Sequence, residues 1–478
     1  MSGWKGFDCL VATAIPRSRR IHHVRPRYIR QSNRCGSDLP APFALFRYIY
    51  DPKGLRRYPG FSPISGLTDL RHVYLSACGY RSKDLYEAHH RAPILRTGPN
   101  ALSFGNIEAI KDIYGHSTKC IKDLKYVILG GSHTHLFDVV DKGEHSRKRK
   151  TLSAAFAIKH LERWEFKVAQ TTQRLLKAID GHCTPPMISN QTIPDQGDVT
   201  LDFNKWVYLF TMEAINNTAL SSSLGLLDKG TDVVTAQKKD GTLYQARYRE
   251  SQSHTAIAQA VFVWDYKRQW GEIVAEISAI INAGADTTAI ALTQALDFLI
   301  RHPPQLQRLR EKVDSVLDKD DTVAPYDKVK NLSYLRACLD ESLHILPPTS
   351  AALPRRTPPE GAQILGHWIP GDTSVSMPIY AAHRDPEIFP APEEYRPERW
   401  LGPEARKRME PYFIPFSTGA RGCLGRNISY LEQTVVLASV VHRYDFALPS
   451  PEWNIYRHQA FNLILGEMPM KIWRREIT

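Results

Sequence analysis

The chain has 478 residues, a formal net charge of +12, 42% hydrophobic and 23% charged residues. These values are normal for a globular protein and allow a sizeable core. The seven cysteines are scattered, odd in number and without a C-x-x-C pair, which argues against a disulfide framework or a zinc ribbon and favours a reducing compartment.

Residues 1–45 show no clear periodicity and are rich in arginine. Seven arginines and no acidic residue lie between Arg17 and Arg34. No run in the chain reaches the ~20 consecutive apolar residues that a membrane-spanning helix needs. We therefore expect an irregular basic segment without a visible anchor, followed by one large domain over 46–478. The positive charge points to an anionic membrane surface or an acidic protein, since nothing in the chain looks like a nucleic-acid module.

The first half of the domain contains several short elements. Residues 96–104 read as a strand end and a turn, and 107–114 as a short helix. A basic helix follows over 145–156, in which His145 and Arg149 are four residues apart and share one face. On its own such a face is most simply a solvated one.

The middle of the chain predicts helices over 206–219 and 253–266, with a hairpin turn over 238–242. Next, 270–300 predicts a long helix that contains Ala283-Gly284-Ala285-Asp286-Thr287-Thr288. A glycine and a threonine weaken the helical hydrogen-bond ladder, because threonine can bond to a carbonyl one turn earlier. An acid beside an alcohol can relay protons, so Asp286 and Thr287 are candidate catalytic residues. The alternative is a buried helix with no such role.

The most informative segment is Phe416-Ser417-Thr418-Gly419-Ala420-Arg421-Gly422-Cys423-Leu424-Gly425. A single cysteine stands in a glycine-rich loop before the apolar helical stretch 428–441. Glycines let backbone N–H groups approach the sulfur, and these donors with a helix N-terminus favour a thiolate. Such a thiolate can be the axial ligand of haem iron. The alternative is a buried structural cysteine.

The pattern F-x-x-G-x-R-x-C-x-G resembles the signature of the cytochrome P450 family. The match to A-G-x-D-T-T at 283–288 and to P-E-R-[FW] at 397–400 extends the resemblance over about 45–475. It implies the P450 fold, a single large domain that is mainly α with small β-sheets (α+β). It also implies haem b as cofactor with Cys423 as the metal ligand. The implied residues of the haem site are Cys423, Arg421, Phe416, Gly419, Gly425, His145, Arg149 and Arg355, with Arg356 as the alternative to Arg355.

Two departures from the family pattern stand out. The family has E-x-x-R where this chain has Glu341 and His344, so the ion-pair trio with Arg399 contains a histidine that cannot form a bidentate fork. The lid between the basic helix and the long helix also looks shortened near 265–270. Both departures weaken the expected support for haem and the substrate pocket.

The resemblance implies a monooxygenase that oxidises, by hydroxylation in the simplest case, a lipophilic small molecule in fungal secondary metabolism. The alternatives are an isomerase or dehydratase of the same fold that uses no reductase, or a catalytically impaired haem binder. The implied partners are O2, an NADPH-dependent cytochrome P450 reductase and, at its periphery, a membrane. The implied location is the surface of the endoplasmic reticulum, or otherwise the cytoplasm. The segments expected to line the substrate pocket are 136–137, 282–283, 350–352 and 462–464, and the expected docking residues for the reductase are Arg406, Lys407 and Arg408.

Overall fold

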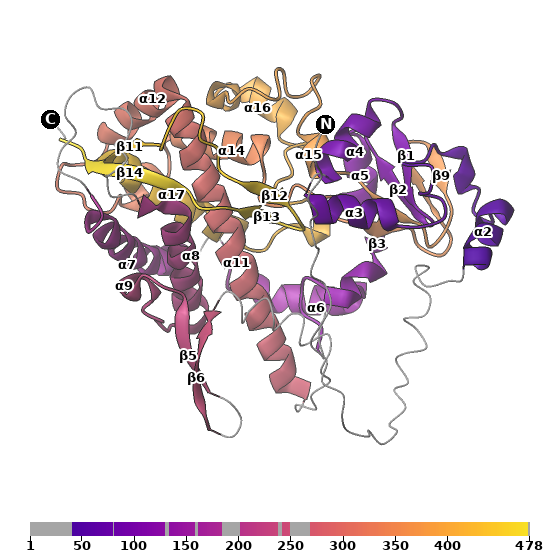
Figure 1. The fold of residues 1–478 in the computed structure, drawn as a ribbon, viewed down its shortest axis with the longest axis horizontal. Coiled ribbons are helices and arrows are strands. Elements are labelled where there is room, and N and C mark those ends of the chain that lie inside the picture. The colour runs from indigo at the N-terminus through magenta and orange to yellow at the C-terminus, as the bar shows by residue number, and fades with distance from the viewer. Residues whose placement is uncertain are drawn as a thin grey trace, which may run out of the picture.

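The structure is a computed structural model that describes residues 41–79, 81–129, 133–157, 161–183, 201–237, 241–248 and 268–476. Helices are the dominant elements and small sheets surround them (Figure 1). The prediction of a mainly helical α+β domain is confirmed. The predicted helix over 253–266 lies outside the described residues, as do residues 1–40 of the basic segment.

The bounds of the elements are as follows. The helices are α2 (Ala41–Tyr50), η1 (Leu55–Arg57), α3 (Leu70–Cys78), α4 (Arg81–His89), α5 (Ala109–Tyr114), η2 (Leu124–Leu129), α6 (Lys142–Ser153), α7 (Leu161–Asp180), α8 (Phe203–Leu220), α9 (Leu226–Lys229), α11 (Arg268–Arg301), α12 (Pro303–Asp314), α13 (Tyr326–Val329), α14 (Ser333–Ile345), α15 (Ile379–Ala382), η4 (Pro397–Trp400), α16 (Pro403–Met409), η5 (Gly419–Arg421) and α17 (Arg426–Arg443). The strands are β1 (Ile94–Gly98), β2 (Ala101–Phe104), β3 (Ile121–Lys122), β4 (Leu201–Asp202), β5 (Val233–Gln237), β6 (Leu243–Arg247), β7 (Arg355–Arg356), β8 (Ala362–Ile364), β9 (His367–Ile369), β10 (Ser374–Ser376), β11 (Tyr444–Ala447), β12 (Arg457–Gln459), β13 (Leu463–Leu465) and β14 (Pro469–Arg474).

The long helix α11 runs through the middle of the helical body (Figure 1). Its C-terminal half is rich in Ala, Leu and Ile, and these side chains join the largest buried apolar cluster with α7, α8, α14 and α17. The close packing of α8 on α11 depends on Gly284, where a β-carbon would lie 2.9 Å from Cδ1 of Ile215 on α8. The helix that carries the Asp286-Thr287 pair is thus fixed by the core itself.

The five-stranded sheet, in the order β1-β2-β10-β7-β3, joins segments far apart in the sequence. β1 and β2 form an antiparallel hairpin, β10 lies parallel to β2, and the two-residue strands β7 and β3 pair antiparallel at the edge. A second apolar cluster packs beneath this sheet against α5 and η4. The sheet places residues of 94–122 beside residues of 355–376.

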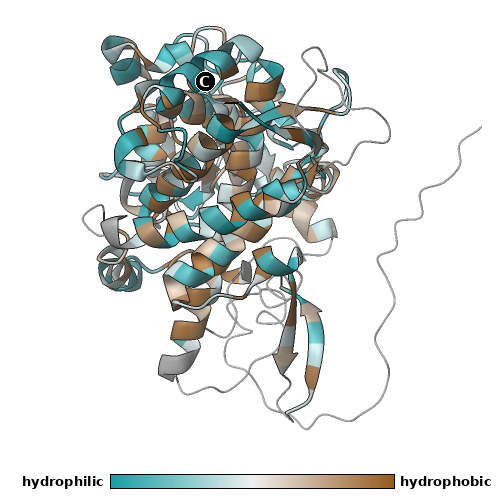
Figure 2. Cartoon of the chain, turned by 90° about the vertical axis from the view of Figure 1, so that its left-hand side faces the viewer, coloured by the Kyte–Doolittle hydropathy of each residue, from teal (hydrophilic) through white to brown (hydrophobic). Residues whose placement is uncertain are grey.

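The N-terminal end of α11 and the hairpin β5–β6 project from the helical body, and both carry hydrophobic positions (Figure 2). Ile273 and Val274 on α11, and Leu243 and Tyr244 on β6, are more than two-fifths exposed. β6 ends at residue 247 and α11 begins at 268, so no more than 20 residues join them. This is the point at which the sequence indicates a shortened lid, although 249–267 lie outside the described residues.

Among the described residues, the segment Gly271–Arg301 of α11 is long and apolar enough to cross a membrane by length and composition. The same segment packs against α8, α14 and α17, as the core helix of a globular domain does. Its composition is therefore weak evidence for a membrane span.

Candidate active site

The cysteine loop runs from 416 to 425 and leads directly into α17. The N–H of Cys423 donates to the carbonyl of Phe416 over 2.8 Å, which closes the loop. Gly419 has a φ of 69°, and a β-carbon there would collide with the backbone oxygen of Tyr114 on α5. Both the left-handed conformation and the close approach require glycine at this position.

Opposing influences act on the thiol of Cys423, an exposed residue. Burial raises the pKa of this thiol. The backbone N–H groups of Gly425 and Arg426 and the charge of Arg149 act in the opposite direction and lower that pKa. A metal ion at the sulfur would remove the proton, because coordination favours the thiolate.

The basic residues predicted for the haem site lie close together around this loop. Arg149 on α6 donates from Nη1 to the carbonyl of Gly422 over 2.7 Å. Arg421 donates to the carbonyls of Val139 and Val140 over 2.6 and 3.1 Å. His145 is buried, and burial together with Arg421 and Arg149 lowers its pKa to about 4.

Another basic residue, Lys122, joins this group, although no sequence motif marks it. Lys122 is the register partner of Arg355 across the β3–β7 pair, and both are buried. Burial, Arg355 and Arg421 lower the pKa of Lys122 to about 6. Like charges directly opposite each other in a sheet are destabilising unless an anion lies between them. Arg356, the alternative to Arg355, points instead to Asp372 at 3.6 Å.

This group of five basic residues, which we call the cationic cluster, comprises Lys122, His145, Arg149, Arg355 and Arg421. In the described part of the chain none of the five forms an ion pair with a carboxylate. The acids that act on the cluster are Asp141, near Arg421, and Asp138, near Lys122. Burial raises the pKa of Asp138 to about 6, which reduces its negative charge near neutrality. Lys122, Arg149 and Arg421 donate to backbone carbonyls rather than to carboxylates, so the cluster fits a ligand that brings carboxylates.

On α11 the predicted threonine contact is present. The hydroxyl of Thr287 donates to the carbonyl of Ala283 over 2.6 Å, one turn earlier. The helix nevertheless continues without interruption through this segment, so the predicted weakening does not break it. Thr287 is half-buried and Ala283 is exposed, which leaves this side of the helix accessible.

The neighbouring Thr288 ties α11 to α17. Its hydroxyl lies 3.0 Å from that of Ser429, and it also forms a hydrogen bond to the carboxyl of Glu432. Glu432 is fully surrounded by protein, and burial raises its pKa to about 8. This bridge fixes the helix of Asp286 and Thr287 against the helix that follows Cys423. Sequence reasoning missed Glu432, which has no partner nearby in the sequence.

Arg399 and His344 both lie beside the carboxylate of Glu341. Nε of Arg399 lies 3.0 Å from the Glu341 carboxylate, and Nδ1 of His344 lies 3.5 Å from it. The indole N–H of Trp400 and the backbone N–H of Arg396 complete the shell at 2.8 and 2.7 Å. Arg399 also donates to three backbone carbonyls between 390 and 394. The Glu341–Arg399 pair therefore holds without a guanidinium at position 344.

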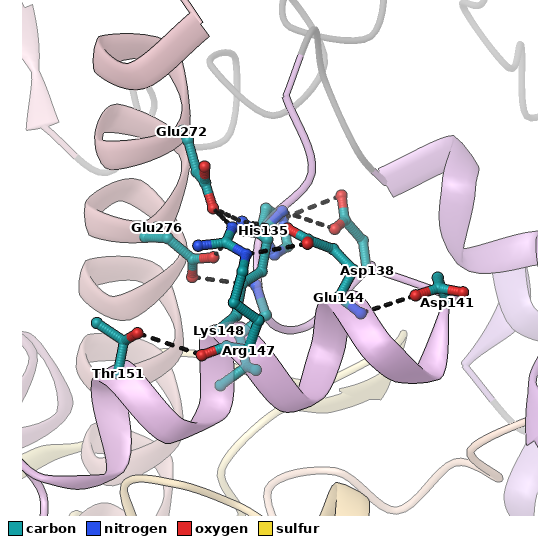
Figure 3. A network of polar contacts seen from close by, with 10 residues as sticks. His135, Asp138, Asp141, Glu144, Arg147, Lys148, Thr151, Glu272 and Glu276 are labelled. Atoms are coloured by element: carbon teal, nitrogen blue, oxygen red, sulfur yellow. Dashed lines mark hydrogen bonds and ion pairs between the residues drawn. The ribbon is translucent and has the colours of Figure 1, made fainter.

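A second polar network joins α6 to the exposed end of α11 (Figure 3). Nζ of buried Lys148 lies 2.5 Å from Glu272 and 2.9 Å from Glu276, and Arg147 pairs with Glu272 as well. Glu276 also accepts the backbone N–H of Leu136 over 3.0 Å. The network holds α6, the helix of His145 and Arg149, against α11. Sequence reasoning did not predict this network, because the residues it joins lie more than 120 positions apart in the chain.

Two of the segments expected to line the substrate pocket have contacts with residues beside other such segments. The rings of Phe137 and Phe461, the residue before 462–464, are 5.7 Å apart, edge to face. The N–H of Leu463 donates over 2.8 Å to the carbonyl of Pro348, two residues before 350–352. Phe137 and Ile464 are exposed, whereas Ser350 is buried and its hydroxyl donates to the carbonyl of Pro347.

Comparison with known proteins gives a consistent result. The sequence model of the family Cytochrome P450 matches residues 265–472. The cytochrome P450 monooxygenase atnE of Emericella nidulans is 28% identical over 86% of this chain and 88% of its own length. The trichothecene C-15 hydroxylase of Fusarium sporotrichioides is 29% identical over 90% of this chain and 94% of its own.

Solved structures show the same fold. The haem domain of cytochrome P450DA superposes with a TM-score of 0.67 at 15% identity, and the match covers 85% of this chain and 95% of that one. A triple mutant of the same domain gives a TM-score of 0.67 at 17% identity, with equal coverage.

Proposed function

We propose that the chain is a member of the cytochrome P450 family, a haem-thiolate monooxygenase that oxidises a lipophilic small molecule in fungal secondary metabolism. The observation that carries the proposal is the cysteine loop, with the exposed Cys423, N–H donors around its sulfur and the cationic cluster beside it. The relatives from Emericella and Fusarium support the monooxygenase class by name.

The residues fit haem b. Cys423 would supply the axial thiolate, and the cationic cluster would hold the two propionates, which provide the carboxylates that the cluster lacks. When bound, haem supplies the activation of dioxygen and the oxidation of the substrate. Gly419 keeps the loop close to α5, and Phe416 packs on Tyr430 with ring centroids 5.1 Å apart, so the loop is held before any ligand is present.

The proton relay would run through α11. Thr287 can rotate its hydroxyl from the Ala283 carbonyl toward the open side of the helix, where it can donate to a bound ligand or a water molecule. Asp286, one residue earlier, would return a proton to that hydroxyl through water. The bridge from Thr288 to Ser429 and Glu432 keeps this turn of α11 in place while the hydroxyl moves.

The partners follow from the chemistry. A member of this family needs a small-molecule substrate, O2 and a redox partner. We assign the redox role to an NADPH-dependent reductase that docks on a basic surface. Lys407 and Arg408 on α16 are exposed and suit such a surface, whereas Arg406 is engaged with Asp340 at 3.3 Å.

Contact with the surface of the endoplasmic reticulum would use the apolar faces of α2 and α3. Their exposed hydrophobic side chains are Phe43, Leu45, Phe46, Ile49 and Tyr50 on α2, and Leu70, Val73 and Tyr74 on α3. Interfacial helices of this kind bury such side chains at the headgroup boundary and gain from nearby basic charge. The Arg-rich stretch 17–34 precedes α2 in the sequence and supplies that charge.

The proposal is tested by turnover with a reductase under ¹⁸O2. We expect one labelled oxygen atom in the product of an accepted lipophilic substrate, with one NADPH consumed per product. Thr287→Ala should leave NADPH consumption intact and lower the product formed per NADPH. Thr151→Ala is the matched control, because Thr151 makes the same bond to the carbonyl four residues earlier but lies on α6. Unlabelled product, or equal coupling in both variants, contradicts the proposal.

A further inference from the structure

Two buried histidines, His344 and His383, exchange hydrogen bonds with each other's backbone. Nε2 of His344 lies 2.7 Å from the carbonyl of His383, and Nδ1 of His383 lies 3.1 Å from the carbonyl of His344. The second ring nitrogen of His383 accepts the N–H of Ile414 over 3.0 Å. Both histidines are completely buried, so these bonds face no competition from bulk water.

The hydrogen bonds fix the protonation of the His383 ring and place a proton on Nε2 of His344. Because Nε2 of His383 accepts from Ile414, its proton is on Nδ1, where it is donated to the carbonyl of His344. Burial, His344 and Arg384 hold the pKa of His383 well below its usual value, in agreement with a neutral ring. His344 in turn donates from Nε2, which leaves its Nδ1 facing Glu341 at 3.5 Å.

The groups around this pair hold both rings in place. The ring of Phe389 is 4.6 Å from that of His344, and the ring of Phe413 is 5.4 Å from that of His383. Arg384 donates to the carbonyl of Ile345 over 2.9 Å and pairs with Glu393. The pair is therefore a fixed link between the end of α14 and the segment that contains Ile414.

Ile414 stands at the entrance of the cysteine loop. Its carbonyl accepts the N–H of Ser417 over 2.9 Å, and the carbonyl of Phe416 accepts the N–H of Cys423 over 2.8 Å. An unbroken series of bonds thus runs from α14 through the two histidines to the cysteine.

We propose that His344 and His383 are positioning residues that set the conformation of the cysteine loop. Their reciprocal hydrogen bonds connect α14 to the loop. An arginine at position 344 would otherwise provide this connection through its guanidinium. Glu341 and Arg399 then hold α14 to the segment 390–399, and the histidine pair holds α14 to the loop. The role of the pair in haem ligation rests on the proposed function, whereas its role in ordering the loop does not.

Matched amide variants separate the two nitrogen atoms of His383. His383→Gln keeps an oxygen near the position of Nε2, where it accepts from Ile414, and loses the Nδ1 donor. His383→Asn keeps a donor near Nδ1 and loses the acceptor. We expect amide hydrogen exchange at Ile414 and Cys423 to be about fivefold to tenfold faster in the Asn variant than in the Gln variant, since one hydrogen bond to the loop is lost.

His344→Gln and His344→Asn supply the same comparison from the other end, because only Gln retains a donor toward the carbonyl of His383. In the haem-bound protein we expect both Asn variants to shift the reduced carbon monoxide spectrum toward the form that has lost the thiolate ligand, and the Gln variants to keep the spectrum of the parent.

Equal exchange rates within each Gln and Asn pair would overturn the proposal, and so would a thiolate spectrum unaltered in both Asn variants. Absence of haem from the parent protein would refute the proposed function instead, and the exchange comparison on that same protein would still decide the role of the pair.

Discussion

Glu432 should make the stability of this protein fall as the pH rises, and Glu432→Gln should remove that dependence. The carboxyl is buried between α17 and α11, with the hydroxyl of Thr288 as its hydrogen-bond partner. Burial raises its pKa in the folded chain to about 8, against an ordinary value of 4.5. Between these two values the folded state binds a proton that the unfolded state has released.

The size of the effect follows from the shift. Since the folded state binds more protons, the free energy of unfolding falls by about 1.4 kcal/mol per pH unit through this window. The loss in the free energy of unfolding that Glu432 causes is about 1 kcal/mol at pH 5.5 and about 3 kcal/mol at pH 7. This loss reaches its full value above pH 8. Glutamine has the same shape and still accepts from Thr288, but it carries no proton to lose.

Urea unfolding followed by circular dichroism at pH 5.5, 7 and 8.5 measures this difference. We expect Glu432→Gln to be more stable than the parent by an amount that grows with pH. Glu410→Gln, at an exposed position, is the control and should give no such trend. A stability difference between Glu432→Gln and the parent that does not change with pH would refute the assignment of a buried, protonated carboxyl.

Two further substitutions test the loop and the cationic cluster. Gly419→Ala should destabilise the fold by about 2–4 kcal/mol in urea unfolding, because the φ of 69° and the backbone of Tyr114 both oppose a side chain. Gly402→Ala is the control and should change the stability little, because a β-carbon there would lie 3.7 Å from its nearest neighbour. Lys122→Met should stabilise the haem-free chain, because it removes a buried amine whose desolvation lowers its pKa to about 6, yet it should accelerate haem loss about tenfold if this amine binds a propionate in its protonated form. Stability and haem retention that change in the same direction would contradict the role given to Lys122.

Much of the fold could be predicted from local patterns. The apolar periodicity of 270–300 and 428–441 matches α11 and α17, and the segment 206–219 matches α8 within three residues at either end. The strands β3 and β7 could not be predicted in this way, because two-residue strands carry no periodicity and exist only through pairing with distant partners.

Some residues of the candidate site could likewise be predicted from local sequence motifs, and others could not. Cys423, Arg421 and Arg149 stand in short motifs, and the structure brings them together. Lys122, Glu432 and His383 have no motif that marks them, and their roles depend on partners that only tertiary packing supplies. At position 344 the sequence shows that a guanidinium is missing, but the compensating bonds to His383 appear only in three dimensions.

The reduced carbon monoxide difference spectrum of the purified protein tests the central claim most directly. We expect the red-shifted Soret band of a haem with a thiolate ligand, and its loss in Cys423→Ser. Haem uptake without that band in the parent chain, or a thiolate band that survives in Cys423→Ser, would contradict the account.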